Sequence, residues 1–487
     1  MAAVALAIIV LAVAVRFAAL SSQPGGLYPD EGAEALDAHR LLLQAGFHPV
    51  FFRDDGGREA LFAYLVAIAF RVWGESVPVL RGVSATLGVL AVIALYPALS
   101  RFGRAAALAG MAWAAGALWL IVISRDGMRN ILAPLFGALL IWALIRWADR
   151  PRPGTALVAG AVAGAGLWTY QPLKLTPLLL ALWLLWIRRQ DHDRYRAMRA
   201  GLAWTALAYV VIAGPMLATA ITDPTNYFGR AAGVSPLNPA NNGISLVAHT
   251  AQTLGMFAFT GDPNPRHNVA SLPLLGWPLL ALAGAGAYRC WRRRSQPAYA
   301  LLLLGIPVFM LPPLLGIDGW APHFLRSVGL APFLAGVIGI GAVEVVEMLA
   351  PVLRPGWGVA AAVTVVAALL IGLGAGSAFA YFSRPVSARY HEYSFDVVAL
   401  AKAAGSGDAV IIDDYNRIDV DFLDAAHPPA VFRPGTRIPD LNRYSRVVAL
   451  RREDIAAGLG TAASARATVI ERGPDGRPAV WSVSPWR

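Results

Sequence analysis

The chain has 487 residues, of which 57% are hydrophobic and only 15% are charged. Soluble domains carry nearer a quarter of charged residues, so this composition excludes an ordinary soluble protein and favours a polytopic α-helical membrane protein. The net charge of +11 does not indicate nucleic acid, because the basic residues lie mostly in short loops between apolar runs, as the positive-inside rule expects. The single cysteine, Cys290, excludes an internal disulfide and a thiolate metal cluster.

The first apolar run begins at Met1 and ends near Leu20. It is long and has no basic segment before it, so we expect a signal anchor that stays as the first spanning helix. Ten further apolar runs predict spanning helices, because about 20 apolar residues cross a hydrocarbon core of roughly 30 Å. They lie near residues 77–100, 105–123, 130–147, 155–169, 172–187, 200–220, 271–288, 297–316, 325–349 and 357–381.

The strongly basic loops fix the sides of the membrane. Residues 59–74 also have the composition of a spanning helix, but a span there would put these loops outside. We therefore predict a juxtamembrane helix at 59–74, within one external loop of residues 21–76. This gives eleven spanning helices, with the N-terminus inside and the C-terminus outside. The loops placed in the cytoplasm are 101–104, 146–154, 188–199 and 289–296, and the long loop 221–270 faces outside.

The sequence changes character at about Ser383, where short apolar runs begin to alternate with polar residues. Such runs predict strands, and residues 395–405 between them have helical spacing. We expect residues 1–382 to form a transmembrane part and residues 383–487 a small extracytoplasmic α/β domain. The expected strands are 409–413, 446–450, 467–472 and 478–484.

Carboxylates gather directly after the first apolar run, in "YPDEG" (28–32). They could simply end the first helix and solvate the loop. Three features favour a function instead. Pro29 restricts the backbone before Asp30, the following residues have helical spacing that places Asp30 and Glu31 at a helix N-terminus, and many cations also map to the outer side. These cations are Arg53, Arg58, Arg125, Arg129, Lys174, Arg230, Arg266 and Arg326.

External cations depart from the positive-inside rule and therefore indicate an anionic ligand at the outer face. Arginine clusters bind phosphate through charge-assisted hydrogen bonds. A carboxylate beside such a cluster can take a proton from an acceptor hydroxyl, while the cations stabilise a departing phosphate.

This layout resembles the GT-C glycosyltransferases that use polyprenyl-phosphate sugars, above all protein O-mannosyltransferases and lipid A aminoarabinose transferases. "YPDEG" is similar to the Asp-Glu signature of that family, "GREALFAYLVAIAFRVWGESVPVLR" (57–81) to the segment that follows it, and "SRDGMRN" (124–130) falls where the family has a second external acid. The resemblance covers residues 1 to about 190, is loose up to residue 380 and is absent from the tail.

The resemblance implies that Asp30 is the base that activates the acceptor hydroxyl and that Glu31 orients Asp30 or the sugar. Arg58 and Arg129 are assigned to the donor phosphate. Asp126 stands in the place of the second acid, although the flanking Arg125 and Arg129 favour the alternative of a structural ion pair.

Three further stretches carry candidate contacts to the donor phosphate or sugar. Lys174 could instead extend toward the interface among aromatic residues, and residues 261–268 could be a solvated loop. Arg326, slightly inside the membrane, is costly unless it is paired. The candidate residues are Lys174, Arg266, His267, Asn268, His323 and Arg326.

The sequence thus predicts an inverting membrane glycosyltransferase with its active site outside the plasma or inner membrane. The expected partners are a polyprenyl-phosphate sugar donor and a glycan, lipid or protein acceptor. We expect no cofactor and no required metal, because no Asp-X-Asp motif lies in a predicted external loop of the transmembrane part, and the one at 419–421 lies in the tail. The alternative is a transporter or flippase of lipid-linked sugars, although neither inverted repeats nor ionisable residues at mid-span are visible.

Overall fold

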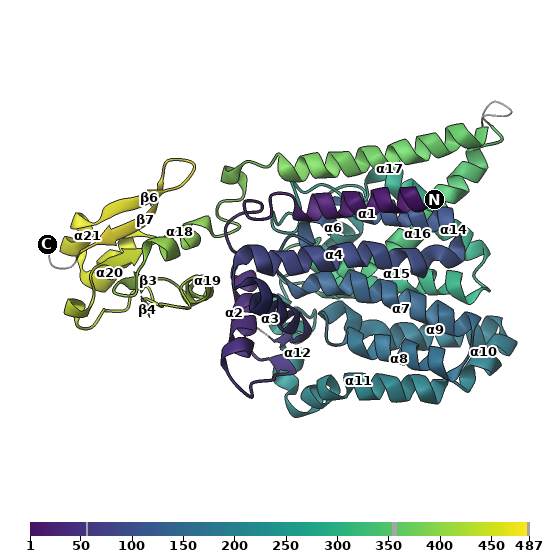
Figure 1. Ribbon diagram of the computed structural model, residues 1–487, viewed down its shortest axis with the longest axis horizontal. Coiled ribbons are helices and arrows are strands. Elements are labelled where there is room, and N and C mark those ends of the chain that lie inside the picture. Colours follow the sequence, from purple (N-terminus) through teal and green to yellow (C-terminus); the bar gives the residue numbers. More distant parts are fainter. Residues whose placement is uncertain (55–56, 353–357, 485–487) are drawn as a thin grey trace.

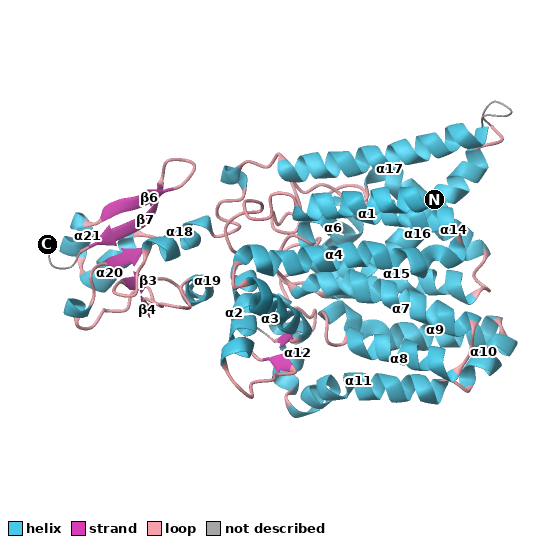
Figure 2. Cartoon of the chain, viewed as in Figure 1, coloured by secondary structure: helices cyan, strands magenta, loops and turns pink. Residues whose placement is uncertain are grey.

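A computed structural model describes the chain except residues 55–56, 353–357 and 485–487. A bundle of long, roughly parallel helices forms most of the molecule, and a smaller part containing a sheet lies beyond one end of the bundle (Figures 1 and 2). The fold is therefore mostly helical with a small C-terminal sheet, as predicted.

The bundle is built from apolar helices in the order that the hydrophobic runs predict. Every one of the eleven predicted spans contains a helix, and the run at 105–123 is divided at Ala117 into two. The helices are α1 (Ala2–Phe17), α2 (Pro29–Leu43), α3 (Leu61–Trp73), α4 (Val77–Leu99), α5 (Arg104–Gly116), α6 (Leu118–Ile123), α7 (Leu132–Asp149), α8 (Pro153–Gly166), α9 (Thr176–Gln190), α10 (His192–Arg199), α11 (Leu202–Thr222), α12 (Pro224–Gly233), α13 (Leu246–Gly255), α14 (Gly276–Arg292), α15 (Pro297–Leu315), α16 (Ala331–Leu349) and α17 (Gly358–Phe382).

Within the described residues, six helical segments are long and apolar enough to cross a membrane. Three shorter apolar helices, α1, α3 and α8, accompany them. The chain is a multi-pass membrane protein, and the count of eleven spans stays a prediction. The six segments are Val77–Phe102, Arg129–Asp149, Leu202–Thr222, Pro297–Leu315, Leu325–Leu349 and Gly358–Phe382.

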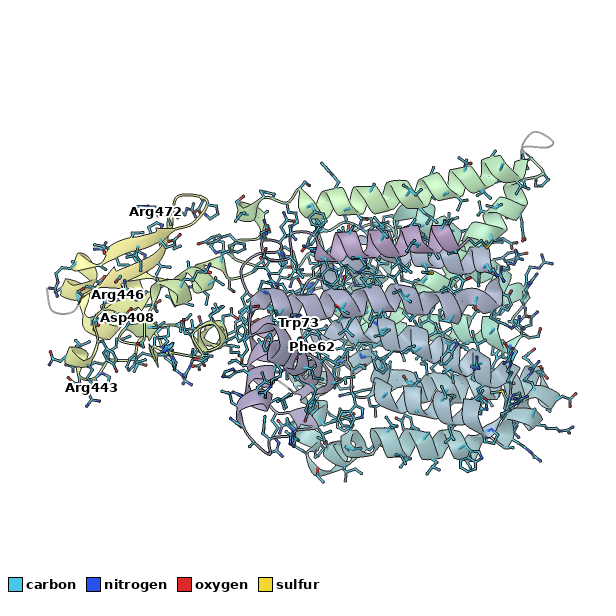
Figure 3. The ribbon with its side chains drawn as sticks, in the orientation of Figure 1. Phe62, Trp73, Asp408, Arg443, Arg446 and Arg472 are labelled. Carbon is cyan, nitrogen blue, oxygen red and sulfur yellow. The ribbon has the colours of Figure 1, made fainter. Side chains whose placement is uncertain are left out.

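Two helices, α2 and α3, lie at the end of the bundle that faces the sheet (Figure 1). In Figure 1, α2 runs across the ends of the long helices, as a juxtamembrane helix would. α3 buries Phe62 against the bundle and exposes 72% of Trp73 at its far end (Figure 3). Between α2 and α3, strands β1 (Phe51–Phe52) and β2 (Arg58–Glu59) form an antiparallel pair.

The C-terminal part contains a five-stranded sheet in the order β4-β3-β5-β7-β6. β3 pairs in parallel with β4 and β5, whereas β7 pairs antiparallel with β5 and β6. Asp408 and Arg446, just before β3 and β5, form an ion pair at 2.9 Å that ties these strands together (Figure 3). The elements are α18 (Phe395–Ala403), β3 (Ala409–Ile411), α19 (Asp414–Leu423), β4 (Ala430–Phe432), β5 (Val447–Ala449), α20 (Arg452–Leu459), α21 (Thr461–Arg466), β6 (Thr468–Arg472) and β7 (Pro478–Val483).

The segment after α17 attaches the C-terminal part to the loop before α2. The Tyr393 carbonyl accepts a 2.8 Å hydrogen bond from the Leu27 amide, and Arg389 donates to the carbonyls of Ser22 and Pro24. A Cβ at Gly26, whose φ is +48°, would lie 1.9 Å from the Tyr393 carbonyl oxygen. Only glycine fits this crossing of two backbones.

Candidate active site

The acids of α2 face the protein interior. Pro29 occupies the first turn of the helix, and Glu31, Glu34 and Asp37 follow at intervals of three residues. This spacing places them on neighbouring turns of one face. All three are buried, and each forms an ion pair with a buried arginine. The acids at the start of this loop are therefore not a solvated helix end.

Glu31 is held in a saturated ion pair. Arg81 of α4 donates Nε to Oε1 at 2.8 Å and Nη2 to Oε2 at 2.7 Å. The Gly127 amide donates to Oε1 at 2.7 Å and the Tyr28 amide to Oε2 at 3.2 Å. Because its oxygens already accept four hydrogen bonds, Glu31 joins α2 to α4 and to the 124–129 turn. If Glu31 orients Asp30, as predicted, it does so by fixing the position of α2 against α4.

Arg129 and Arg58 hold the next two turns of α2. Arg129 contacts Glu34 at 2.7 Å and Glu59 at 3.1 Å, and Arg58 contacts Asp37 through both Nε and Nη2. Burial raises the pKa of Asp37 to about 6, although the charge of Arg58 opposes this shift. Both arginines thus have carboxylate partners inside the protein, and their predicted contact with a donor phosphate stays a prediction.

Lys174 points into the protein and not toward the membrane interface. Its Nζ lies 3.3 Å from Glu59 Oε1 and 3.9 Å from the centre of the Tyr227 ring. The alternative of a side chain that extends outward among aromatic residues is therefore wrong in this structure. Lys174 instead joins the cluster of Glu34, Glu59 and Arg129.

Asp30 differs from the other acids of this run because its side chain is half-buried. It lies in the first turn of α2, where the helix dipole stabilises a carboxylate. Two residues earlier, the Tyr28 ring lies 3.6 Å from the guanidinium carbon of Arg266. Asp30 is thus the acid of α2 that is not fully buried.

Asp126 accepts a 3.1 Å hydrogen bond from the hydroxyl of Tyr393. Burial raises the pKa of Asp126 well above its usual value, and the charge of Glu31 raises it further. Arg125 donates to four backbone carbonyls at the end of α1 and in the loop after it. Arg125 therefore caps α1, and Arg129 is paired with Glu34 and Glu59. Asp126 thus does not form the expected ion pair with either arginine.

The 261–268 loop is built around Asp262, which is fully buried. Its two oxygens accept hydrogen bonds from the Asn264 amide, the His267 ring, the Trp320 ring and the Phe324 amide, at 2.6 to 2.9 Å. Asn268 donates to the carbonyls of Asp262 and Leu272. The alternative of a solvated loop is therefore wrong, and Asn268 serves the loop's own backbone.

A metal ion could draw on three side chains at this place. Single ligand atoms of Asp262, His267 and His323 lie within 4.8 Å of one another. The hydrogen bonds of Asp262 already occupy its carboxylate, however, and one of them holds His267 through Nδ1. This arrangement orients His267 more readily than it binds an ion.

His323 and Arg326 lie beside His267. The His323 ring stacks on Trp320 at 5.3 Å between centroids and lies 4.9 Å from the His267 ring. Burial lowers the pKa of His323 well below its usual value, and nearby His267 and Arg326 lower it further. Arg326 is paired with Asp318 and donates to the Gly316 carbonyl, which supplies the partner that a cation at this depth requires.

Several buried polar atoms between these groups have no hydrogen-bond partner among the described residues. They include Arg129 Nη2, both amide atoms of Asn130, Gln171 Nε2 and His323 Nδ1. The charges of Arg129, Arg230 and Arg326 all act on the hydroxyl of Tyr170, which lies next to Gln171. Buried polar groups are normally paired, so this cluster has the chemistry of a site for a polar, negatively charged ligand.

Sequence reasoning missed several residues of this arrangement. Glu34, Asp37 and Glu59 were not assigned as partners of the arginines, although the three-residue spacing on α2 was visible. From the C-terminal part, Tyr393 reaches Asp126 and Asp419 reaches Gly32 of α2, and nothing in the local sequence signals these contacts.

Comparisons with known proteins agree with this architecture. A family model described as dolichyl-phosphate-mannose-protein mannosyltransferase matches residues 59–218. ArnT from Cupriavidus metallidurans, solved with bound undecaprenyl phosphate, superimposes with a TM-score of 0.63 at 15% identity, over 99% of this chain and 97% of that one. Residues 59–218 match that family model, and the chain as a whole has the GT-C fold. The predicted resemblance is confirmed at this level, and the ArnT match extends the GT-C fold over the part of the chain where the sequence resemblance was loose or absent.

A second solved structure of the GT-C fold is also similar to this chain. The archaeal oligosaccharyltransferase AglB from Archaeoglobus fulgidus, in complex with an inhibitory peptide and a dolichol-phosphate, matches with a TM-score of 0.57 at 13% identity, over 99% of this chain and 74% of that one. No curated protein sequence matches the chain significantly. At these identities the likeness establishes the fold alone.

Proposed function

We propose that this chain is an inverting membrane glycosyltransferase that moves one sugar from a polyprenyl-phosphate donor to an acceptor hydroxyl. The observation that carries the proposal is the position of Asp30, half-buried in the first turn of α2, two residues after Tyr28, whose ring lies 3.6 Å from the guanidinium carbon of Arg266. A proton acceptor next to a phosphate-binding cluster is the arrangement that this transfer requires.

The donor is proposed to bind with its phosphate near Arg326 and Arg230. Both charges act on the Tyr170 hydroxyl, and Arg129 and Lys174 lie beneath them in the Glu59 cluster. The bound undecaprenyl phosphate of ArnT and the dolichol-phosphate of AglB support a lipid phosphate as the ligand class. Arg266 and His267, on the other side, are proposed to contact the phosphate or the sugar.

In the proposed reaction, the Asp30 carboxylate accepts the proton of the acceptor hydroxyl. The hydroxyl oxygen then attacks the anomeric carbon from the face opposite the phosphate, and the bond from that carbon to the phosphate oxygen breaks. Polyprenyl phosphate leaves with the electron pair, and the arginines stabilise its charge. Attack from the opposite face inverts the configuration. No metal is required in this scheme, and that stays a prediction.

The proposed orientation places α2, the site and residues 383–487 outside the membrane, with residues 1–382 as the catalytic part. The basic loops at the other ends of the helices support it, since short cytoplasmic loops carry an excess of arginine. In Figure 1, α10, in one of these basic loops, lies at the end of the bundle opposite α2 and the sheet.

The test uses purified full-length protein in detergent with synthetic polyprenyl-phosphate sugars. Release of free polyprenyl phosphate from at least one of these donors, dependent on added acceptor, is the expected result. The matched control is Asp30→Asn, which preserves side-chain shape. If no donor is consumed while the protein moves a labelled lipid-linked sugar across liposome membranes, the chain is a flippase and the proposal fails.

A further inference from the structure

The C-terminal part docks on the candidate site through one face of α19. The Tyr415 ring meets the Tyr28 ring edge-on at 6.1 Å between centroids, and the Phe422 ring stacks on Phe70 at 6.1 Å. Asp419 lies on the same helix between these two contacts, at the spacing that shares their face. The helix thus carries a carboxyl group into an interface that is otherwise aromatic.

Asp419 is fully buried, and neither of its oxygens has a hydrogen-bond partner among the described residues. It lies against Gly32 of α2, where an added Cβ would be 2.4 Å from Asp419 Oδ1. The absence of a side chain at Gly32 therefore lets this carboxyl group approach the backbone of α2 two residues after Asp30.

The charges around Asp419 are mostly negative. Asp30 and Glu31 of α2 and Asp396 of α18 act against its ionisation. Arg81 of α4 favours it, but the Arg81 guanidinium is already bound to Glu31. Tyr28 and Tyr415 are the titratable rings beside it.

Burial, followed by the charges of Glu31 and Asp30, raises the pKa of Asp419 well above its usual range. A buried carboxyl group without a counter-ion is stable in its neutral form. The neutral form is therefore the one that fits the docked interface.

We propose that Asp419 is a positioning residue of the active site, supplied by the C-terminal part as a neutral carboxyl group that holds the N-terminus of α2, and with it Asp30, in place. Loss of its proton would add a negative charge beside Asp30 and Glu31 without a free counter-ion. Docking of α19 should then weaken, because the docked state binds one proton more than the undocked state. The catalytic part of this inference rests on the proposed function, whereas the docking part does not.

The first test is independent of activity. Infrared spectra of the full-length protein at neutral pH should contain a carbonyl band of a protonated carboxyl group that is lost in Asp419→Asn. The matched control is Asp421→Asn on the same helix, since Asp421 is partly exposed and paired with Arg417 at 3.1 Å. That variant should keep the band. An unchanged spectrum in Asp419→Asn would overturn the proposal.

Hydrogen exchange then measures docking. As the pH is raised above the usual carboxyl range, the wild type should lose amide protection in α2 and α19, compared with Asp419→Asn at the same pH. The asparagine variant cannot ionise and should keep its protection. Equal protection of the two proteins across the whole range would contradict the role of the proton.

Measurements of sugar transfer test whether Asp419 affects catalysis. Asp419→Asn should remove the alkaline fall of kcat/KM that the wild type shows, because the asparagine cannot ionise. An alkaline limb that is identical in both proteins would overturn the positioning role. If the wild type transfers no sugar at all, the proposed function fails, while the infrared and exchange results still decide whether Asp419 is the neutral docking group.

Discussion

Three buried ion pairs explain why a hydrophobic chain gathers acids after its first helix. Glu31, Glu34 and Asp37 each bind an arginine from a different segment, so α2 is fixed on three successive turns. Buried pairs add little net stability, because desolvation offsets most of the attraction. Their effect is on position, since removing one partner leaves the other charge buried and uncompensated.

Glu31→Gln should therefore act mainly on stability. Arg81 would lose its counter-ion in a buried place, and breaking a buried pair costs about 3–5 kcal/mol. We expect a clearly lower midpoint of thermal unfolding in detergent, measured by tryptophan fluorescence. The double variant Glu31→Gln/Arg81→Met should recover part of the loss. A midpoint equal to that of the wild type would mean that the pair does not hold α2.

Asp30→Asn should leave the fold intact and stop the chemistry. General-base catalysis contributes roughly 10²–10⁴ in rate, so turnover should fall at least about 100-fold. Donor binding, measured by calorimetry with a polyprenyl-phosphate sugar, should be close to that of the wild type. Near-normal turnover of this variant would remove Asp30 from the reaction.

The pKa of Asp37, raised to about 6, gives a stability slope with a defined sign. An unfolded aspartate titrates near 3.9, so the folded protein binds more protons between these two values. Stability should therefore fall as the pH rises from about 4 to about 6. Asp37→Asn should flatten this part of the curve of unfolding midpoint against pH, relative to the wild type. Parallel curves for the two proteins would contradict the shift.

At the level of elements, hydrophobic runs were sufficient to predict the helices of the bundle, because burial in lipid requires a continuous apolar helix. The break at Ala117 was not predicted, since no proline or glycine marks that residue itself. Four of the strands were predicted by alternation, whereas β4 (Ala430–Phe432) follows a pair of prolines that hid it. β3, the strand that pairs with β4, lies about 20 residues earlier, so no local sequence pattern indicates that the two strands pair.

The orientation of α3 can be tested by cysteine labelling. The native Cys290 is buried and can first be replaced by serine. Cysteines introduced at Gly74 and Ser76 should react with an impermeant thiol reagent added outside intact cells. A cysteine at Arg199, in a predicted cytoplasmic loop, is the matched control and should stay unlabelled. Labelling of 74 and 76 only after the membrane is opened would reverse the topology.

At the level of the whole molecule, the C-terminal part packs against the candidate site. Tyr393 bonds to Asp126 and to the Leu27 amide, and α19 covers the start of α2. Individual candidate residues could be predicted from sequence because carboxylates and cations stand out in an apolar chain. Their partners could not, because Asp126–Tyr393 and Gly32–Asp419 join residues hundreds of positions apart.

A chain that ends at residue 382 should therefore insert in the membrane but fail to transfer sugar. Tyr393→Phe in the full chain is the matched finer variant, since it removes only the hydroxyl that bonds to Asp126. It should cost about 1–3 kcal/mol of stability, because a buried acceptor loses its donor. Full turnover by the shortened chain would show that the C-terminal part is not needed for the reaction.

The contact between residues 26–32 and residues 393–419 also has a consequence for timing during synthesis. The Asp-Glu motif is made among the first residues of the chain, and the groups that pack against it are made more than 360 residues later. At about 5–20 residues per second, that delay is on the order of 20 to 70 s. During this interval the bundle can assemble while the Asp-Glu loop still lacks its cover. On the proposed function, a chain interrupted before residue 393 should therefore lack sugar transfer, because the groups that pack against the Asp-Glu loop are missing.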